Sequence, residues 1–106
     1  MEEPNLDYIN EMAETDDVLR AQFIAILKEE LPKEIKTYHD HINSERYTHA
    51  ACLVHKLKHK IIILGLNTDY ELAESHELQL KNNDFSFKKD FSDILDKMLK
   101  FVVELQ

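Results

Sequence analysis

The chain has 106 residues, a length that predicts a single domain over residues 1–106. It contains one glycine and two prolines, too few for the many tight turns of an all-β fold, so the composition favours helices. Its formal net charge of −8 argues against a nucleic-acid-binding protein, because such proteins normally present a basic face.

Cysteine usage and the N-terminal residues indicate the compartment. The single cysteine, Cys52, cannot form an internal disulfide, which fits a reducing compartment, and we expect its thiol to be packed or half-buried. Met1-Glu2-Glu3 is acidic and no apolar run follows it, unlike a signal peptide. No apolar segment approaches the about 20 residues that span a bilayer. We therefore predict a cytoplasmic protein without membrane contact.

The first part of the chain predicts a short helix followed by a long one. Asn5 or Asp7 can cap the short helix, and Thr15-Asp16-Asp17 begins the long one with acidic residues in its first turn. Pro32 predicts a kink or a brief break, after which the same apolar face resumes. The long helix is predicted to end at Asn43-Ser44. The apolar positions of the two helices are Leu6, Ile9 and Met12, then Leu19, Phe23, Ile26, Leu27, Ile35, Tyr38 and Ile42.

The next helix, predicted over residues 47–64, carries one histidine opposite its apolar stripe. At about 100° per residue, His55 falls on the outward side, with Lys58 and His59 as its surface neighbours one turn away. Gly65 is a typical helix terminator. The stripe consists of Ala50, Leu53, Val54, Leu57, Ile61 and Leu64; Lys56 and Lys60 add positive charge around His55, and Ala51 and Ile62 flank it.

Two further helices complete the predicted fold. Asn67-Thr68-Asp69 can cap the first, a polar turn over residues 81–84 ends it, and Ser86 is a candidate cap for the last. The last helix has the most regular stripe, at Phe91, Ile94, Leu95, Met98, Phe101, Val102 and Leu105. Because the connections are short, we predict an all-α, up-down antiparallel four-helix bundle with an additional short N-terminal helix.

The residues around His55 identify a family. His55-Lys56-Leu57-Lys58, followed by Leu64-Gly65 at the end of the same helix, resembles the histidine-containing phosphotransfer (HPt) domains of two-component phosphorelays. The family usually has a small residue, often glycine, directly after that lysine, whereas this chain has His59. The departure bears on how closely a partner can approach on that side.

The resemblance implies that His55 accepts a phosphoryl group and that Lys58 offers its ammonium to the phosphoryl oxygens. It implies receiver domains of hybrid kinases or response regulators as partners, with Mg²⁺ bound by the receiver and no cofactor of the chain's own. Such a phosphocarrier is not an independent enzyme, and we expect a monomer. Gln79 is the candidate polar residue near the acceptor, in a second layer with His59, and Ala51, Lys56, Lys60 and Ile62 are candidates for partner docking.

Two other functions remain open on the sequence. His55 and His59, four residues apart on one helix, could clamp a metal ion, although the chain has no Glu-x-x-His pair of the kind that di-metal bundles use. We therefore predict no physiological metal site. A helical adaptor that needs no phosphoacceptor is the other possibility, and it would bind its partner equally well without the His55 imidazole.

Overall fold

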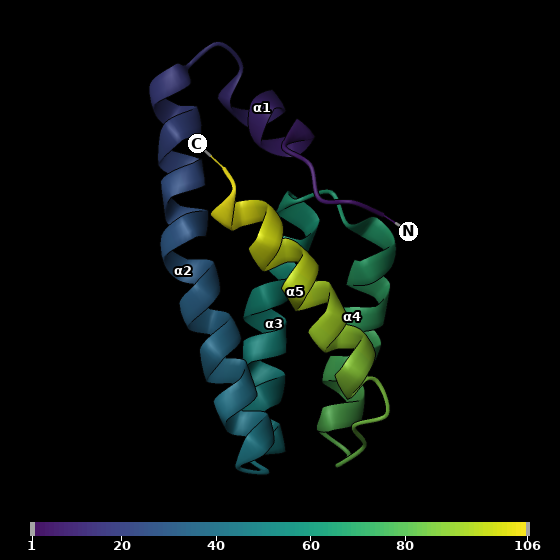
Figure 1. Ribbon diagram of the computed structural model, residues 1–106. Helices are drawn as coiled ribbons and strands as arrows, with labels where there is room; N and C mark the ends of the chain where they lie inside the picture. Colours follow the sequence, from purple (N-terminus) through teal and green to yellow (C-terminus); the bar gives the residue numbers. More distant parts are fainter. Residues whose placement is uncertain (1, 106) are drawn as a thin grey trace.

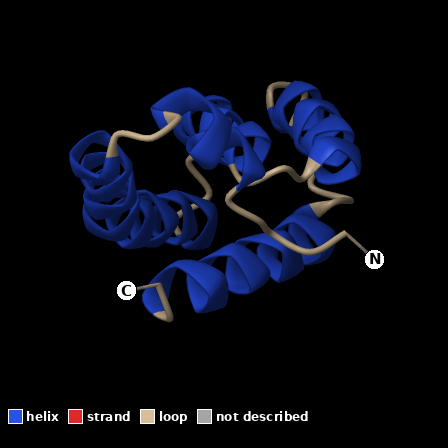
Figure 2. Ribbon diagram, turned by 90° about the horizontal axis from the view of Figure 1, so that it is seen from above, coloured by secondary structure: helices blue, strands red, loops and turns tan. Residues whose placement is uncertain are grey.

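The computed structural model describes residues 2–105, and these residues form five α-helices joined by short connections. No strand occurs among the described residues (Figure 2). The prediction of an all-α chain is therefore confirmed. In chain order the helices are α1 (Asp7–Ala13), α2 (Asp17–Asn43), α3 (Tyr47–Ile63), α4 (Asn67–Leu80) and α5 (Lys88–Val103).

The four long helices contact one another in a closed order. α3 packs against both α2 and α4, and α5 contacts α2 and α4, while α1 packs on α2 (Figure 1). The molecule is elongated, with principal extents of 45 × 23 × 18 Å. Within residues 2–105, no helix combines the length and the apolar character needed to cross a membrane.

Helix α2 is continuous through Pro32, so the brief break considered at this residue does not occur. The helix begins as predicted, because the Asp16 side chain accepts a hydrogen bond of 2.9 Å from the amide of Leu19. Its apolar residues resume on the same face beyond the proline, where Ile35, Tyr38 and Ile42 are buried. α2 therefore presents one long apolar stripe to α3 and α5.

The core contains one polar pair. Tyr38 of α2 and His76 of α4 are both fully buried, and the Tyr38 hydroxyl lies 2.7 Å from Nε2 of His76. The Phe91 ring packs against both side chains, at centroid distances of 5.2 and 5.0 Å. This pair links α2 to α4 through the interior, and the apolar residues around it exclude water. Burial lowers the pKa of His76 to about 4 and raises that of Tyr38.

The turn between α3 and α4 is held by the N-terminal segment. Gly65 has φ +79°, and a Cβ at this position would lie 2.6 Å from the Asn5 side chain, so the turn requires glycine. The Asn5 amide donates a hydrogen bond of 2.9 Å to the carbonyl of Leu64. Glu2 Oε1 accepts from the amides of Thr68 and Asp69, so the first turn of α4 is capped by Glu2 rather than by its own side chains.

Candidate functional site

The outward face of α3 is narrower than its sequence indicates. Because α3 lies between α2 and α4, residues on both sides of the predicted stripe are buried as well. Ala51 faces the core and is 1% exposed, so the expectation that it lies on the outward, docking face is wrong. Lys56 is exposed and Ile62 is 37% exposed, as predicted for both.

His55 projects from this outward face and is held by a carboxylate from the neighbouring helix. Its side chain is 60% exposed, and its Nδ1 lies 3.2 Å from Oε2 of Glu77 on α4. An ionised carboxylate can only accept, so Nδ1 carries the proton and donates a hydrogen bond to Glu77. In the neutral ring Nε2 then has a free lone pair. The ring is thereby fixed in one tautomer, with its nucleophilic nitrogen on the side away from Glu77.

Glu77 also binds two lysines. Its Oε1 lies 2.8 Å from Nζ of Lys58, and its Oε2 lies 3.6 Å from Nζ of Lys81, at the end of α4. Burial alone would raise the pKa of Glu77, but the contacts with Lys58, His55 and Lys81 outweigh it and hold the pKa below its usual value. Glu77 is therefore ionised at neutral pH. We call His55, Lys58, His59, Glu77 and Lys81 the acceptor cluster.

The two lysines predicted on either side of His55 are not free at the surface. The Lys58 side chain is 11% exposed, and its contact with Glu77 raises its pKa. Lys60 is equally buried and binds Glu30 and Glu34 of α2 at 3.0 and 3.1 Å. The expectation of exposed ammonium groups at these positions is therefore wrong, because each lysine lies at a helix interface where a carboxylate neutralises it.

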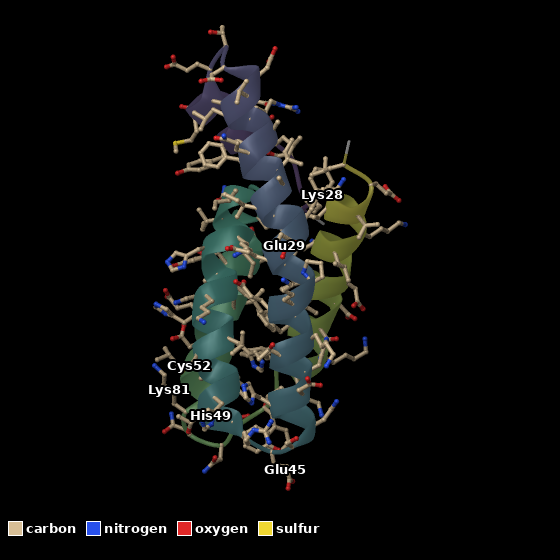
Figure 3. The ribbon with its side chains drawn as sticks, turned by 90° about the vertical axis from the view of Figure 1, so that its left-hand side faces the viewer. Lys28, Glu29, Glu45, His49, Cys52 and Lys81 are labelled. Carbon is tan, nitrogen blue, oxygen red and sulfur yellow. The ribbon has the colours of Figure 1, made fainter. Side chains whose placement is uncertain are left out.

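His59 lies beside the acceptor. The rings of His55 and His59 are edge to face, with centroids 5.6 Å apart. Cys52, three residues before His55, is exposed rather than packed or half-buried as expected. Figure 3 shows His49, Cys52 and Lys81 on the same side of the molecule, which is the outward side of α3.

Glu77, not Gln79, is the α4 residue that contacts the acceptor. Side chains two residues apart on a helix point in directions about 200° apart, so Glu77 and Gln79 cannot both face His55. Gln79 is half-buried, and none of its hydrogen bonds within residues 2–105 reaches His55. Sequence reasoning missed Glu77 because one carboxylate among many carries no distinguishing pattern. The available sequence signal was weak: Glu77 lies four residues before Lys81, a spacing that lets the two side chains form an ion pair on one helix.

An apolar groove adjoins the acceptor cluster. It consists of two neighbouring hollows of about 230 and 120 Å³ between α1, α2 and α3, which share lining residues, with His59 and Lys60 at one edge. Tyr8, Met12 and Ile26 at its rim are each more than two-fifths exposed. The groove is lined further by Ile9, Phe23, Leu27, Glu30 and Ile63. A larger hollow of about 520 Å³, between the N-terminal segment and α5, includes no residue of the acceptor cluster.

Within residues 2–105, no group of three or more histidine, cysteine or acidic side chains is arranged to hold a metal ion. Comparison with protein-family models, with curated proteins and with solved structures finds no match for this chain. A functional assignment therefore has to rest on the side chains around His55 and on the surface beside them.

Proposed function

We propose that this protein is a histidine phosphotransfer protein of a two-component phosphorelay, which carries a phosphoryl group on His55 between receiver-domain aspartates. The observation that carries the proposal is the exposed imidazole whose Nδ1 is held by Glu77 at 3.2 Å, which leaves Nε2 free to attack phosphorus. The resemblance of His55-Lys56-Leu57-Lys58 and Leu64-Gly65 to the HPt motif supports the same function.

In the proposed fold, α2 to α5 form an up-down antiparallel four-helix bundle, with α1 across one end of α2. The closed order of contacts, from α2 through α3 and α4 to α5 and back to α2, supports this arrangement. A bundle holds α3 on both sides. His55 then projects from a rigid convex surface that the active site of another protein can enclose.

In the proposed step, the lone pair of His55 Nε2 attacks the phosphorus of an aspartyl phosphate on the receiver. The N–P bond forms as the P–O bond to the aspartate breaks, and the aspartate carboxylate leaves with the electron pair. The proton stays on Nδ1, where Glu77 stabilises the positive charge that develops on the ring. Mg²⁺ bound by the receiver supplies the remaining charge stabilisation.

The lysines around Glu77 keep its charge from opposing this step. A lone carboxylate beside the acceptor would repel the incoming phosphoryl oxygens. Lys58 and Lys81 lie 2.8 and 3.6 Å from Glu77, so the three side chains together carry a net positive charge. We propose that Lys58 offsets the negative charge of Glu77 in this way. Once His55 is phosphorylated, the Lys58 ammonium turns to the phosphoryl oxygens.

The apolar groove beside His59 suits the docking of a receiver. Exposed apolar side chains that gather on one surface commonly mark a contact site. Ile62, which is also exposed, is the neighbour in sequence of Ile63 in the groove lining. A receiver that covers the groove with an apolar helix face would place its aspartate against His55. In this proposal Ile62 and Lys56 lie at the edge of the docking surface, while Ala51 and Lys60 act only through the packing of α3.

The test is incubation with a panel of receiver domains that carry a radiolabelled phosphoryl group, in the presence of Mg²⁺. We expect label that is lost in acid and stable in base on the wild-type chain and on a His49→Gln control, which alters another exposed histidine of α3. His55→Gln should still dock but take no label. Equal labelling of His55→Gln, or no His55-dependent label from any receiver, would contradict the proposal; docking without transfer would indicate an adaptor.

A further inference from the structure

The exposed pair of His55 and His59 has the spacing of a metal-binding pair. Zn–N bonds of about 2.0–2.1 Å in a tetrahedral site place the centroids of two imidazole ligands about 5 Å apart. The two rings lie 5.6 Å apart on successive turns of α3, and both are exposed. Small side-chain rotations would therefore bring one nitrogen of each ring onto a common ion.

Glu77 orients the His55 ring so that its Nε2 can bind a metal ion. Histidines that bind metals usually donate their other ring N–H to a carboxylate, which orients the ring and makes the ligating nitrogen more basic. The contact of 3.2 Å between His55 Nδ1 and Glu77 has this form, and it leaves Nε2 free for the ion.

A second histidine pair, His41 and His49, has no such contact between a ring N–H and a carboxylate of the described residues. The rings of His41 and His49 lie 5.3 Å apart, a similar spacing. However, Arg46 Nε donates a hydrogen bond of 3.0 Å to Nδ1 of His41. Because Nδ1 of His41 accepts this hydrogen bond, the proton of the neutral ring lies on Nε2, and neither nitrogen has a lone pair free for an ion. The hydrogen-bond partner of Nδ1 therefore distinguishes two pairs that the ring spacing alone does not.

We propose, contrary to the prediction from the sequence, that a divalent transition-metal ion such as Zn²⁺ binds between His55 and His59, with water in the remaining coordination positions. No third protein ligand is arranged around the pair among residues 2–105, so we expect weaker binding than at a zinc site with three or four protein ligands. The ion would take the same Nε2 lone pair that attacks phosphorus, so metal binding and phosphorylation of His55 would exclude each other. This second part rests on the proposed phosphotransfer function, whereas the first does not.

The binding itself is tested by titrating the full chain with Zn²⁺ alone, followed by calorimetry and by the histidine ¹⁵N signals. We expect one saturable site, with affinity lowered at least about tenfold in both His59→Ala and His55→Gln, because each variant removes one of two ligands. His49→Ala is the matched control and should bind as the wild type does. Unchanged affinity in His59→Ala, or no saturable binding in the wild type, would overturn the proposal.

The exclusion is tested by repeating the receiver assay with and without Zn²⁺. We expect Zn²⁺ to suppress labelling of the wild type and a chelator to restore it. The labelling of His59→Ala with Zn²⁺, measured relative to the same variant without Zn²⁺, should fall much less, whatever its rate without metal. Equal suppression of wild type and His59→Ala would place the effect in the receiver and contradict the exclusion. If the wild type takes no label even without metal, the phosphotransfer function fails, while the titration still decides the metal site.

Discussion

Two histidines of this protein, His55 and His76, show how their surroundings assign different roles to the same side chain. His55 is 60% exposed, and a carboxylate holds its Nδ1. His76, adjacent in sequence to that carboxylate, is fully buried and faces the hydroxyl of Tyr38 at 2.7 Å. One imidazole is available to a partner, and the other joins α2 to α4. Exposure and the hydrogen-bond partner, not the residue type, therefore separate a candidate site from a core position.

The largest expected effect is the loss of folding stability when acid protonates the buried His76. Burial lowers the pKa of His76 from 6.5 to about 4, so the unfolded chain takes up its proton before the folded chain does. The resulting stability is complete above pH 6.5 and is lost as the pH falls towards 4, a loss of about 3 kcal/mol over the whole window. Urea unfolding at a series of pH values measures it.

His76→Gln is the control for this titration, because an amide can accept a hydrogen bond from Tyr38 and does not titrate. Its unfolding free energy should vary much less between pH 6.5 and 5 than that of the wild type. Above pH 5 Glu77 contributes little slope, since its pKa lies below its usual 4.5 in the folded chain and a carboxyl with a pKa of 4.5 is mostly ionised in the unfolded chain. Equal slopes in the two proteins would show that His76 is not the group responsible.

Removal of the partner hydroxyl should have the next largest effect. Tyr38→Phe leaves a polar nitrogen of His76 buried without a partner, at a cost of about 1–3 kcal/mol in unfolding free energy at pH 7. The matched control is Tyr8→Phe, at a tyrosine that is 44% exposed, which should cost no more than about 0.5 kcal/mol. A similar small loss in both variants would mean that the buried hydrogen bond contributes little.

Glu77→Gln tests whether the carboxylate positions the exposed His55 imidazole. An amide can still lie beside His55, but it stabilises neither the positive ring nor a single tautomer as a carboxylate does. We expect the rate of labelling by a receiver to fall about tenfold, equivalent to about 1.4 kcal/mol in the barrier. The ¹⁵N signals of His55 should show a mixture of tautomers. An unchanged rate together with a single tautomer would exclude a positioning role for Glu77.

The smallest effect is expected on the stability of His55→Gln. Because the His55 side chain is mostly solvated, its replacement should change the unfolding free energy by no more than about 0.5 kcal/mol. Urea unfolding at pH 7 measures the change, and the same preparation should take no phosphoryl label. A loss of several kcal/mol would mean that His55 supports the fold, which would weaken its assignment as a site.

The sequence predicted those features that depend on one helix at a time. The stripe around Leu57 and the termination at Gly65 placed His55 on the outward side of α3, where the structure also has it. Features that depend on two helices were not predictable in this way. The burial of Ala51 and the contact between Glu77 and His55 both follow from how α4 packs on α3, which no periodicity within α3 reports.

The pairing of Lys60 with Glu30 and Glu34, and of Lys58 with Glu77, has a consequence for the kinetics of partner encounter. Charges that are compensated within about 3 Å produce little field beyond the Debye length, which is about 8 Å in 0.15 M salt. Long-range attraction to an acidic receiver is then weak. Stopped-flow association rates should therefore not fall as ionic strength rises, because the chain carries a net charge of −8 and has little attraction to be screened. The apolar groove between α1, α2 and α3 would determine how long the two proteins stay together.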